Sequence, residues 1–145
     1  MFAAPVLADD EPAVRRCWPA FQQLRPNLPD EDEFVRRWRQ QHAEGYRIHY
    51  VEHGGEVAGV FGHRLMSTMI WGRVLYLDDL FVGESWRGTG LGRHLLDTIE
   101  RLARAAGCAS VQLDTGFQRF AAHRSYLRNG YQLSCHHLTL SLAGD

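Results

Sequence analysis

A glycine-rich turn between a predicted strand and a predicted helix constrains the fold of this chain most. The apolar run 74–82 (VLYLDDLFV) predicts a strand, and residues 90–106 carry apolar side chains at helical spacing. Glycines stand in between at Gly88, Gly90 and Gly92. Alternate glycines leave backbone N–H groups uncovered, and a helix N-terminus adds free donors and partial positive charge. The pattern therefore predicts a binding site for a phosphate group.

Arg87 and Arg93 flank this turn, but the common motifs of similar appearance do not fit it. A Walker A loop needs lysine, and all 16 basic residues are arginine, which also excludes a pyridoxal Schiff base and the strand lysine of protein kinases. A dinucleotide motif from Gly88 would need glycine in place of Arg93. The run 83–87 lacks the last glycine of the G-x-S-x-G motif. A turn that merely caps the helix is the structural alternative.

Composition places the chain among small globular proteins. Its 145 residues fit one domain spanning 1–145. With 16 basic against 17 acidic residues, it lacks the basic surface expected for nucleic-acid binding. No segment reaches the ~20 apolar residues of a membrane span. The three cysteines, Cys17, Cys108 and Cys135, are scattered, so we expect reduced thiols and a cytoplasmic location. The histidines show no metal-ligand spacing, and no metal is expected.

The periodicity of the chain predicts two helices, then antiparallel strands, then alternating strands and helices. The expected strands are 2–7, 46–53, 56–65, 74–82, 109–115 and 131–142, with a Gly54-Gly55 hairpin turn. The expected helices are one that begins after Asp9 or Asp10 and is kinked at Pro19, one from the capping box of Asp30 and Glu33 to Gly45, and those over 90–106 and 118–129. This order predicts an α/β fold, a mixed sheet with helices on both faces.

Two motifs resemble those of one family. The run 87–92 (RGTGLG) is similar to the [Q/R]-x-x-G-x-[G/A] signature of the GNAT superfamily of acetyl-CoA-dependent N-acyltransferases. The run 122–131 is similar to the family's A-x-x-x-Y-x-x-x-G-[F/Y] ending. The resemblance covers about 46–142, and only the order of elements agrees before that. The resemblance implies a GNAT-like single domain, with a mostly antiparallel sheet of about six to seven strands flanked by about four helices.

The resemblance also implies acetyl-CoA as co-substrate and a set of residues that bind it. In the family the strand at 74–82 bulges and parts from its neighbour, so that the pantetheine arm hydrogen-bonds its edge. The backbone N–H of Val82 is then the expected donor to the thioester carbonyl. The family often has asparagine where this chain has Arg119, so a phosphate contact and a salt bridge are both open for that residue. The expected cofactor-binding residues are Leu80, Phe81, Val82, Arg87, Gly88, Thr89, Gly90, Leu91, Gly92, Arg93, Arg119 and Ala122.

Two acids interrupt the apolar strand, and one of them is the expected catalytic base. Asp78 and Asp79 lie in a run that resembles the diamine acetyltransferase branch, which has two adjacent acids there. A carboxylate near an apolar slot has a raised pKa and can take the proton that an amine must lose before it attacks. We prefer Asp78 over Asp79 from the resemblance alone. An arginine-paired structural acid is the expectation for one of the two.

Tyr126 is the expected general acid, because a tyrosine at this place in the family protonates the departing thiolate. A core tyrosine with its hydroxyl at the rim is the structural alternative. The cysteines lie outside both motifs, so we expect direct transfer in a ternary complex rather than an acyl-enzyme. His49, His53 and His63 are expected at surface positions of strands, with the substrate side as the alternative.

The acceptor is an amine whose identity the sequence leaves open. The acidic pair and the aromatic first half favour a small cation, polyamine-like or aminoglycoside-like, over a protein lysine or N-terminus. The loop 24–29 and the connection 66–73 are expected to shape its pocket. A non-catalytic acyl-CoA-binding module is the alternative from another class of protein. Only about a dozen residues follow Tyr131, where the family often has two strands, so one last strand is expected. Pairing into a homodimer through a sheet edge is left open.

Overall fold

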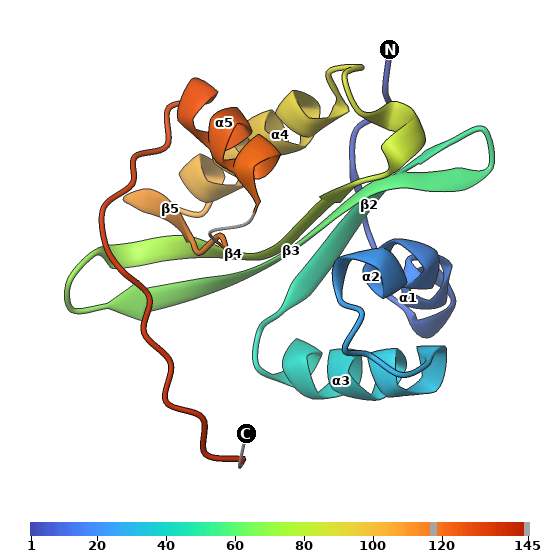
Figure 1. The fold of residues 1–145 in the computed structure, drawn as a ribbon, viewed down its shortest axis with the longest axis horizontal. Coiled ribbons are helices and arrows are strands. Elements are labelled where there is room, and N and C mark those ends of the chain that lie inside the picture. Colours follow the sequence, from blue (N-terminus) through green and yellow to red (C-terminus); the bar gives the residue numbers. More distant parts are fainter. Residues whose placement is uncertain (117–118, 144–145) are drawn as a thin grey trace. The chain divides into compact units, whose positions relative to one another are not determined.

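The computed structural model describes residues 1–116 and 119–143 (Figure 1). The chain divides into two compact units, Met1–Leu113 and the part from Asp114 onward, and each is described by itself. Within the described residues, no helix is both long and apolar enough to cross a membrane.

The first unit is built on one mixed sheet in the order β1-β2-β3-β4-β5 (Figure 1). All neighbours are antiparallel except β4 and β5, which are parallel. This confirms the predicted mixed α/β fold, although the described residues form five strands instead of six to seven. The strands are β1 (Val6–Leu7), β2 (Arg47–His53), β3 (Glu56–Thr68), β4 (Gly72–Val82) and β5 (Ser110–Leu113).

Helices α1 to α3 cover one face of this sheet and α4 covers the other (Figure 1). The first face packs apolar side chains of all three helices, among them Val14, Phe21 and Phe34, against strand residues such as Ile48 and Val60. On the other face α4 approaches β3 closely. The helices are α1 (Glu11–Arg16), α2 (Trp18–Leu24), α3 (Glu31–Ala43), the 3-10 turn η1 (Glu84–Trp86), α4 (Leu91–Ala105) and α5 (Phe120–Arg128).

The capping residues predicted from the sequence do cap the starts of α1 and α3. The Asp10 side chain accepts a hydrogen bond from the Ala13 N–H, and the Asp30 side chain accepts one from the Glu33 N–H, as helix caps do. The expected kink at Pro19 is wrong, because the first helix breaks at Cys17 instead. Pro19 then lies in the first turn of α2, where its missing N–H costs no hydrogen bond.

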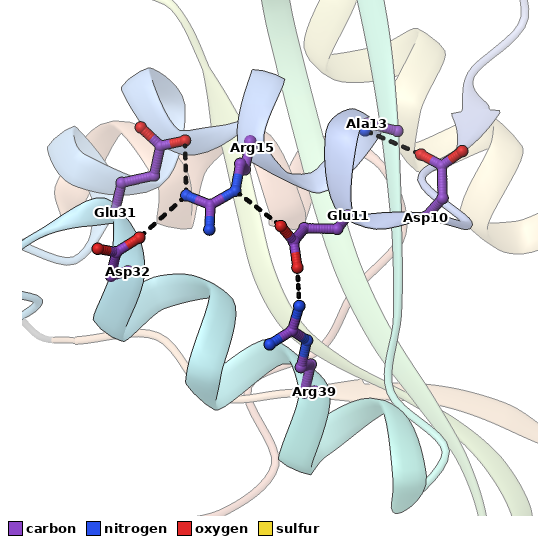
Figure 2. Close-up of polar contacts among 7 residues, drawn as sticks. All are labelled: Asp10, Glu11, Ala13, Arg15, Glu31, Asp32 and Arg39. Atoms are coloured by element: carbon purple, nitrogen blue, oxygen red, sulfur yellow. Dashed lines mark hydrogen bonds and ion pairs between the residues drawn. The ribbon is translucent and has the colours of Figure 1, made fainter.

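An ion-pair network joins α1 to α3 (Figure 2). The Arg15 guanidinium contacts Glu11 on its own helix at 3.1 Å and, on α3, Glu31 at 3.3 Å and Asp32 at 3.1 Å. Glu11 in turn pairs with Arg39 near the middle of α3. A shared network of this kind fixes how α3 lies along α1, and α3 forms part of the site described below.

The expected loop over 66–73 is wrong, because most of it belongs to a long hairpin. Residues 66–68 continue β3, and β4 already begins at Gly72. The Thr68 hydroxyl accepts from the Trp71 N–H at 2.9 Å and donates to the Gly72 carbonyl at 3.1 Å. These bonds close a tight turn in which Gly72 takes a positive φ of 71°. The tip leaves Met69 and Ile70 exposed.

The second unit contains α5, and Gly130 follows it with a positive φ of 90°, as expected for a helix C-terminus. The expected strand over 131–142 is wrong, since these residues form no strand. Alternating apolar and polar residues give a segment two different faces, but a strand also requires another strand to pair with. The start of the expected helix 118–129 at Gln118 lies outside the described residues.

Candidate active site

The predicted glycine turn is open to solvent and leads directly into α4. Gly88 and Gly90 have φ values of 76° and 91°, and a Cβ added at either would meet nothing within 4 Å. Gly90 is the N-cap of α4, which has no side-chain cap and no acidic residue in its first turn. The first N–H groups of a helix have no partner within the helix. Those of α4 therefore face an unobstructed surface that suits an anion.

Of the other residues predicted to bind the cofactor at this turn, two arginines are exposed, and Thr89 and Leu91 stabilise the turn itself. Arg87 and Arg93 are exposed, and their contacts are long, at 3.4 Å to the Val82 carbonyl and 3.9 Å to Asp97. The Thr89 hydroxyl donates to the Trp86 carbonyl and closes the turn. Leu91 is fully buried and anchors the start of α4 in the core.

The edge of β4 is free where the resemblance implies a slot for pantetheine. The parallel ladder joins Val74–Leu77 of β4 to Ser110–Leu113 of β5 and ends there. Beyond Leu77, no strand of the described chain pairs with that edge of β4, whereas Leu80, Phe81 and Val82 remain paired with β3 on the other side. The free edge is followed by the 3-10 turn η1 and then by the glycine turn.

A bulge in the β3–β4 ladder separates the two acids. Gly62 pairs with Asp79 and His63 with Leu77, which leaves Asp78 as the extra residue. The Asp78 carboxylate binds the Arg64 guanidinium through two hydrogen bonds of 2.9 and 2.8 Å. Burial raises the pKa of Asp78, although the Arg64 contact opposes this shift.

The Asp79 carboxylate has two different partners. One oxygen accepts from Arg25 Nε at 2.9 Å, and the other accepts from the Tyr46 hydroxyl at 2.5 Å. Arg25 also donates to the Asp78 carbonyl at 2.8 Å. Burial, followed by the charge of Asp79, raises the pKa of Tyr46 well above its usual range, so the phenol stays a donor. Both acids are thus arginine-paired, where we expected one to be.

Gly62 is what allows Tyr46 to reach Asp79. A Cβ at Gly62 would lie 1.9 Å from the Tyr46 hydroxyl oxygen, so any side chain there would displace the ring. Sequence reasoning missed Arg25, Tyr46, Gly62 and Arg64 altogether. Of these residues, Gly62 carries the one signal that could have been used. A glycine inside a strand often marks a place where another part of the chain approaches closely.

A cavity of about 230 Å³ lies on the α1–α3 face, with Asp79 in its wall. The expected pocket loop 24–29 contributes to it, whereas no residue of 66–73 does. Phe21, Phe34 and Trp38 form apolar walls and also belong to the core. The polar residues of the lining are Arg25, Asn27, Arg37, Gln41, Tyr46 and Asp79.

His49 and His63 are more buried than expected, whereas His53 at the end of β2 is exposed, as expected. His63 is 6% exposed, and the His49 ring stacks on Phe61 with a centroid distance of 4.8 Å. Burial lowers the pKa of His49 and lowers that of His63 to about 4. Neither ring lines the cavity.

The remaining predicted residues belong to the second unit. Arg119 is the N-cap of α5 and makes no side-chain cap bond. Ala122 and Tyr126 follow on α5 four residues apart, and therefore on one face of the helix. The Tyr126 ring packs edge-on against Tyr131 at 5.5 Å.

Comparisons with known proteins point to one family. The acetyltransferase (GNAT) family model matches residues 13–131. The chain is 29% identical over 137 residues to aminoglycoside N(6')-acetyltransferase type 1 of Stenotrophomonas maltophilia, covering 90% of this chain and 88% of that protein. It is 33% identical over 98 residues to aminoalkylphosphonate N-acetyltransferase of Salmonella typhimurium, covering 66% and 64%. The structure of AAC(6')-Iy with the bisubstrate analogue CoA-S-monomethyl-acetylneamine matches with a TM-score of 0.79 at 15% identity, over 97% of both chains.

The mixed sheet with helices on both faces is the fold of that acetyltransferase structure. The chain belongs to the acetyltransferase (GNAT) family. It is an acetyl-CoA-dependent N-acetyltransferase, like the relatives that it matches.

Proposed function

We propose that this enzyme transfers the acetyl group of acetyl-CoA directly to the primary amine of a small molecule, within a ternary complex. The observation that carries the proposal is the double role of β4. Asp79 of this strand lines the cavity, and the free edge of the same strand continues through Leu80–Val82 toward the glycine turn. A thioester along that edge would end within about 10 Å of Asp79, since a strand rises about 3.3 Å per residue.

The coenzyme would be held mainly by backbone groups. The N–H groups of residues 88–92 bind the pyrophosphate, with Arg87 and Arg93 adding positive charge. The pantetheine arm adds to the free edge of β4 like a further strand. The Val82 N–H holds the thioester carbonyl and stabilises the negative charge that develops on its oxygen.

The amine would enter through the cavity. Asp79 attracts the ammonium and accepts its proton, directly or through a water molecule. The neutral amine then attacks the carbonyl carbon, so that the C–N bond forms as the C–S bond breaks. Tyr126 donates a proton to the departing thiolate and is reprotonated, through solvent, by the second proton that the nitrogen loses as the amide forms. Asp78 is the competing base, because its pKa is raised, but its carboxylate is held by Arg64 and does not line the cavity.

Direct transfer is favoured over an acyl-cysteine intermediate. Cys17 is the buried cysteine, and burial raises the pKa of its thiol to about 12. A thiol of that kind stays protonated and is a poor nucleophile. Cys108 and Cys135 lie outside both family motifs.

A small acceptor is favoured over a protein. The relatives named above are an aminoglycoside and an aminoalkylphosphonate acetyltransferase, and the cavity is small and walled by aromatic side chains. A protein lysine or N-terminus is the second candidate.

The test is thiol release from acetyl-CoA, measured with panels of small amines and of peptides. We expect turnover with small amines, and initial-rate lines that intersect when both substrates are varied. Turnover with peptides alone would overturn the small acceptor. Parallel lines would indicate a covalent intermediate and overturn direct transfer.

A further inference from the structure

We propose that the cavity selects amines that also carry an anionic group, such as a carboxylate or a phosphonate. This inference rests on the proposed function and names the substrate class for the same site. The ammonium of such a zwitterion pairs with Asp79, and its anion pairs with the guanidinium groups of Arg25 and Arg37, which line the same cavity.

The charge of the lining is the first argument. Two arginines and one aspartate line the cavity, so its charged side chains sum to one positive charge. A dication would leave one of its ammonium groups facing arginine. A zwitterion matches both signs, and unmatched charges in a confined site are costly.

Arg37 has hydrogen-bond donors that no described protein group accepts from. Its Nε contacts Glu33 at 2.9 Å, but Arg36 binds both oxygens of the same carboxylate, at 2.8 and 2.7 Å. Two guanidinium groups thus share one acid. Among the described residues, neither terminal nitrogen of Arg37 has a hydrogen-bond partner.

Arg25 and Trp38 also have N–H donors without an acceptor among the described residues. Arg25 uses Nε and one terminal nitrogen on Asp79 and Asp78, and its other terminal nitrogen has no partner in the described parts of the chain. The Trp38 indole N–H is buried without an acceptor. Donors that no protein acceptor uses, on the half-exposed side chains of Arg25 and Arg37, are available to a ligand with acceptor oxygens, and a planar guanidinium suits a carboxylate or phosphonate.

The test compares four short amines at saturating acetyl-CoA: β-alanine and 2-aminoethylphosphonate, which carry an anion, ethanolamine, which is neutral, and ethylenediamine, which is dicationic. We expect kcat/KM to be at least 10-fold higher for the two anionic amines. Equal or faster acetylation of ethanolamine or ethylenediamine overturns the selectivity and leaves the acetyl transfer standing. Failure of every small amine, with peptides as the only acceptors, overturns both proposals.

Arg36 provides a matched control for Arg37, since both bind Glu33 and only Arg37 lines the cavity. Arg37→Gln should raise KM for β-alanine at least 10-fold while kcat stays within about twofold, with little effect on ethanolamine. Arg36→Gln should leave all these constants unchanged. Equal effects of the two substitutions would mean that Arg37 acts only through the stability of α3, and would contradict the proposal.

Discussion

Neighbouring acids on one strand acquire different chemistry from their partners. Both carboxylate oxygens of Asp78 accept hydrogen bonds from Arg64. Those of Asp79 accept one each from Arg25 and Tyr46, and Asp79 lines the cavity. Each carboxylate oxygen has two lone pairs, so Asp79 can still accept a hydrogen bond from a bound ammonium. Position in the cavity therefore favours Asp79 as the residue that meets the amine.

Replacing each acid by its amide separates the two roles. Asp79→Asn should lower kcat/KM for the best amine about 100-fold, because an amide neither attracts the ammonium nor takes its proton. Asp78→Asn should cost less than about 10-fold. Steady-state kinetics measures both, with circular dichroism melting as the folding control. A larger loss of kcat/KM in Asp78→Asn than in Asp79→Asn would identify Asp78 as the catalytic base instead.

Tyr126 has a similarly specific expectation. Tyr126→Phe keeps the ring and removes the proton that the thiolate needs, so kcat should fall about 10- to 100-fold. The affinity for acetyl-CoA, measured by calorimetry, should hardly change. Turnover equal to that of the wild type would remove Tyr126 from the mechanism.

At the scale of elements, the bulge between β3 and β4 determines the site. It leaves Asp78 as the extra residue, so two consecutive acids do not simply alternate between faces. Gly62 on β3 leaves room for the Tyr46 side chain to cross to Asp79. The contact between Tyr46 and Asp79 therefore depends on glycine, which has no side chain, at position 62.

Gly62→Ala tests this dependence. The new methyl would clash with the Tyr46 hydroxyl, and overpacking of this kind costs about 1–3 kcal/mol of unfolding free energy. The variant should be less stable in urea melts and should lose activity. In a Tyr46→Ala background the same Gly62→Ala change should cost less stability, since the clashing hydroxyl and ring atoms are gone. No stability loss in the single variant would contradict the described crossing.

At the scale of the whole molecule, the first unit carries a buried histidine whose protonation opposes folding. The pKa of His63 is lowered by burial to about 4 from an ordinary value of 6.5. Its folded-state pKa lies below its unfolded value, so the unfolded chain binds more protons between these two values. The contribution of neutral His63 to stability is therefore full above about pH 6.5 and is lost as pH falls toward 4.

The wild type should accordingly lose up to about 3 kcal/mol of unfolding free energy from this group between pH 7 and pH 4. His63→Leu should flatten the pH dependence in that window, measured by urea unfolding at a series of pH values. His136→Leu, at an exposed position of the segment 131–143, should leave the curve as in the wild type. A His63→Leu curve parallel to that of the wild type would contradict the assignment.

Features that depend on a few adjacent residues could be predicted from the sequence, and those that depend on crossing contacts could not. The capping by Asp30 and the uncapped glycine start of α4 follow from local backbone chemistry. The bond from Tyr46 to Asp79 joins residues 33 positions apart, so no local pattern indicates it. The expected strand 131–142 failed for a related reason, because strand formation depends on a second segment.

The most direct test of where the coenzyme binds is an amide NMR titration of the intact chain with coenzyme A. We expect the largest shift changes at the N–H groups of Gly88, Gly90, Leu91 and Gly92, followed by those of the free β4 edge at Leu80–Val82, saturating with one coenzyme per chain. Unchanged amides at Gly88 to Gly92 with millimolar coenzyme A would contradict the account.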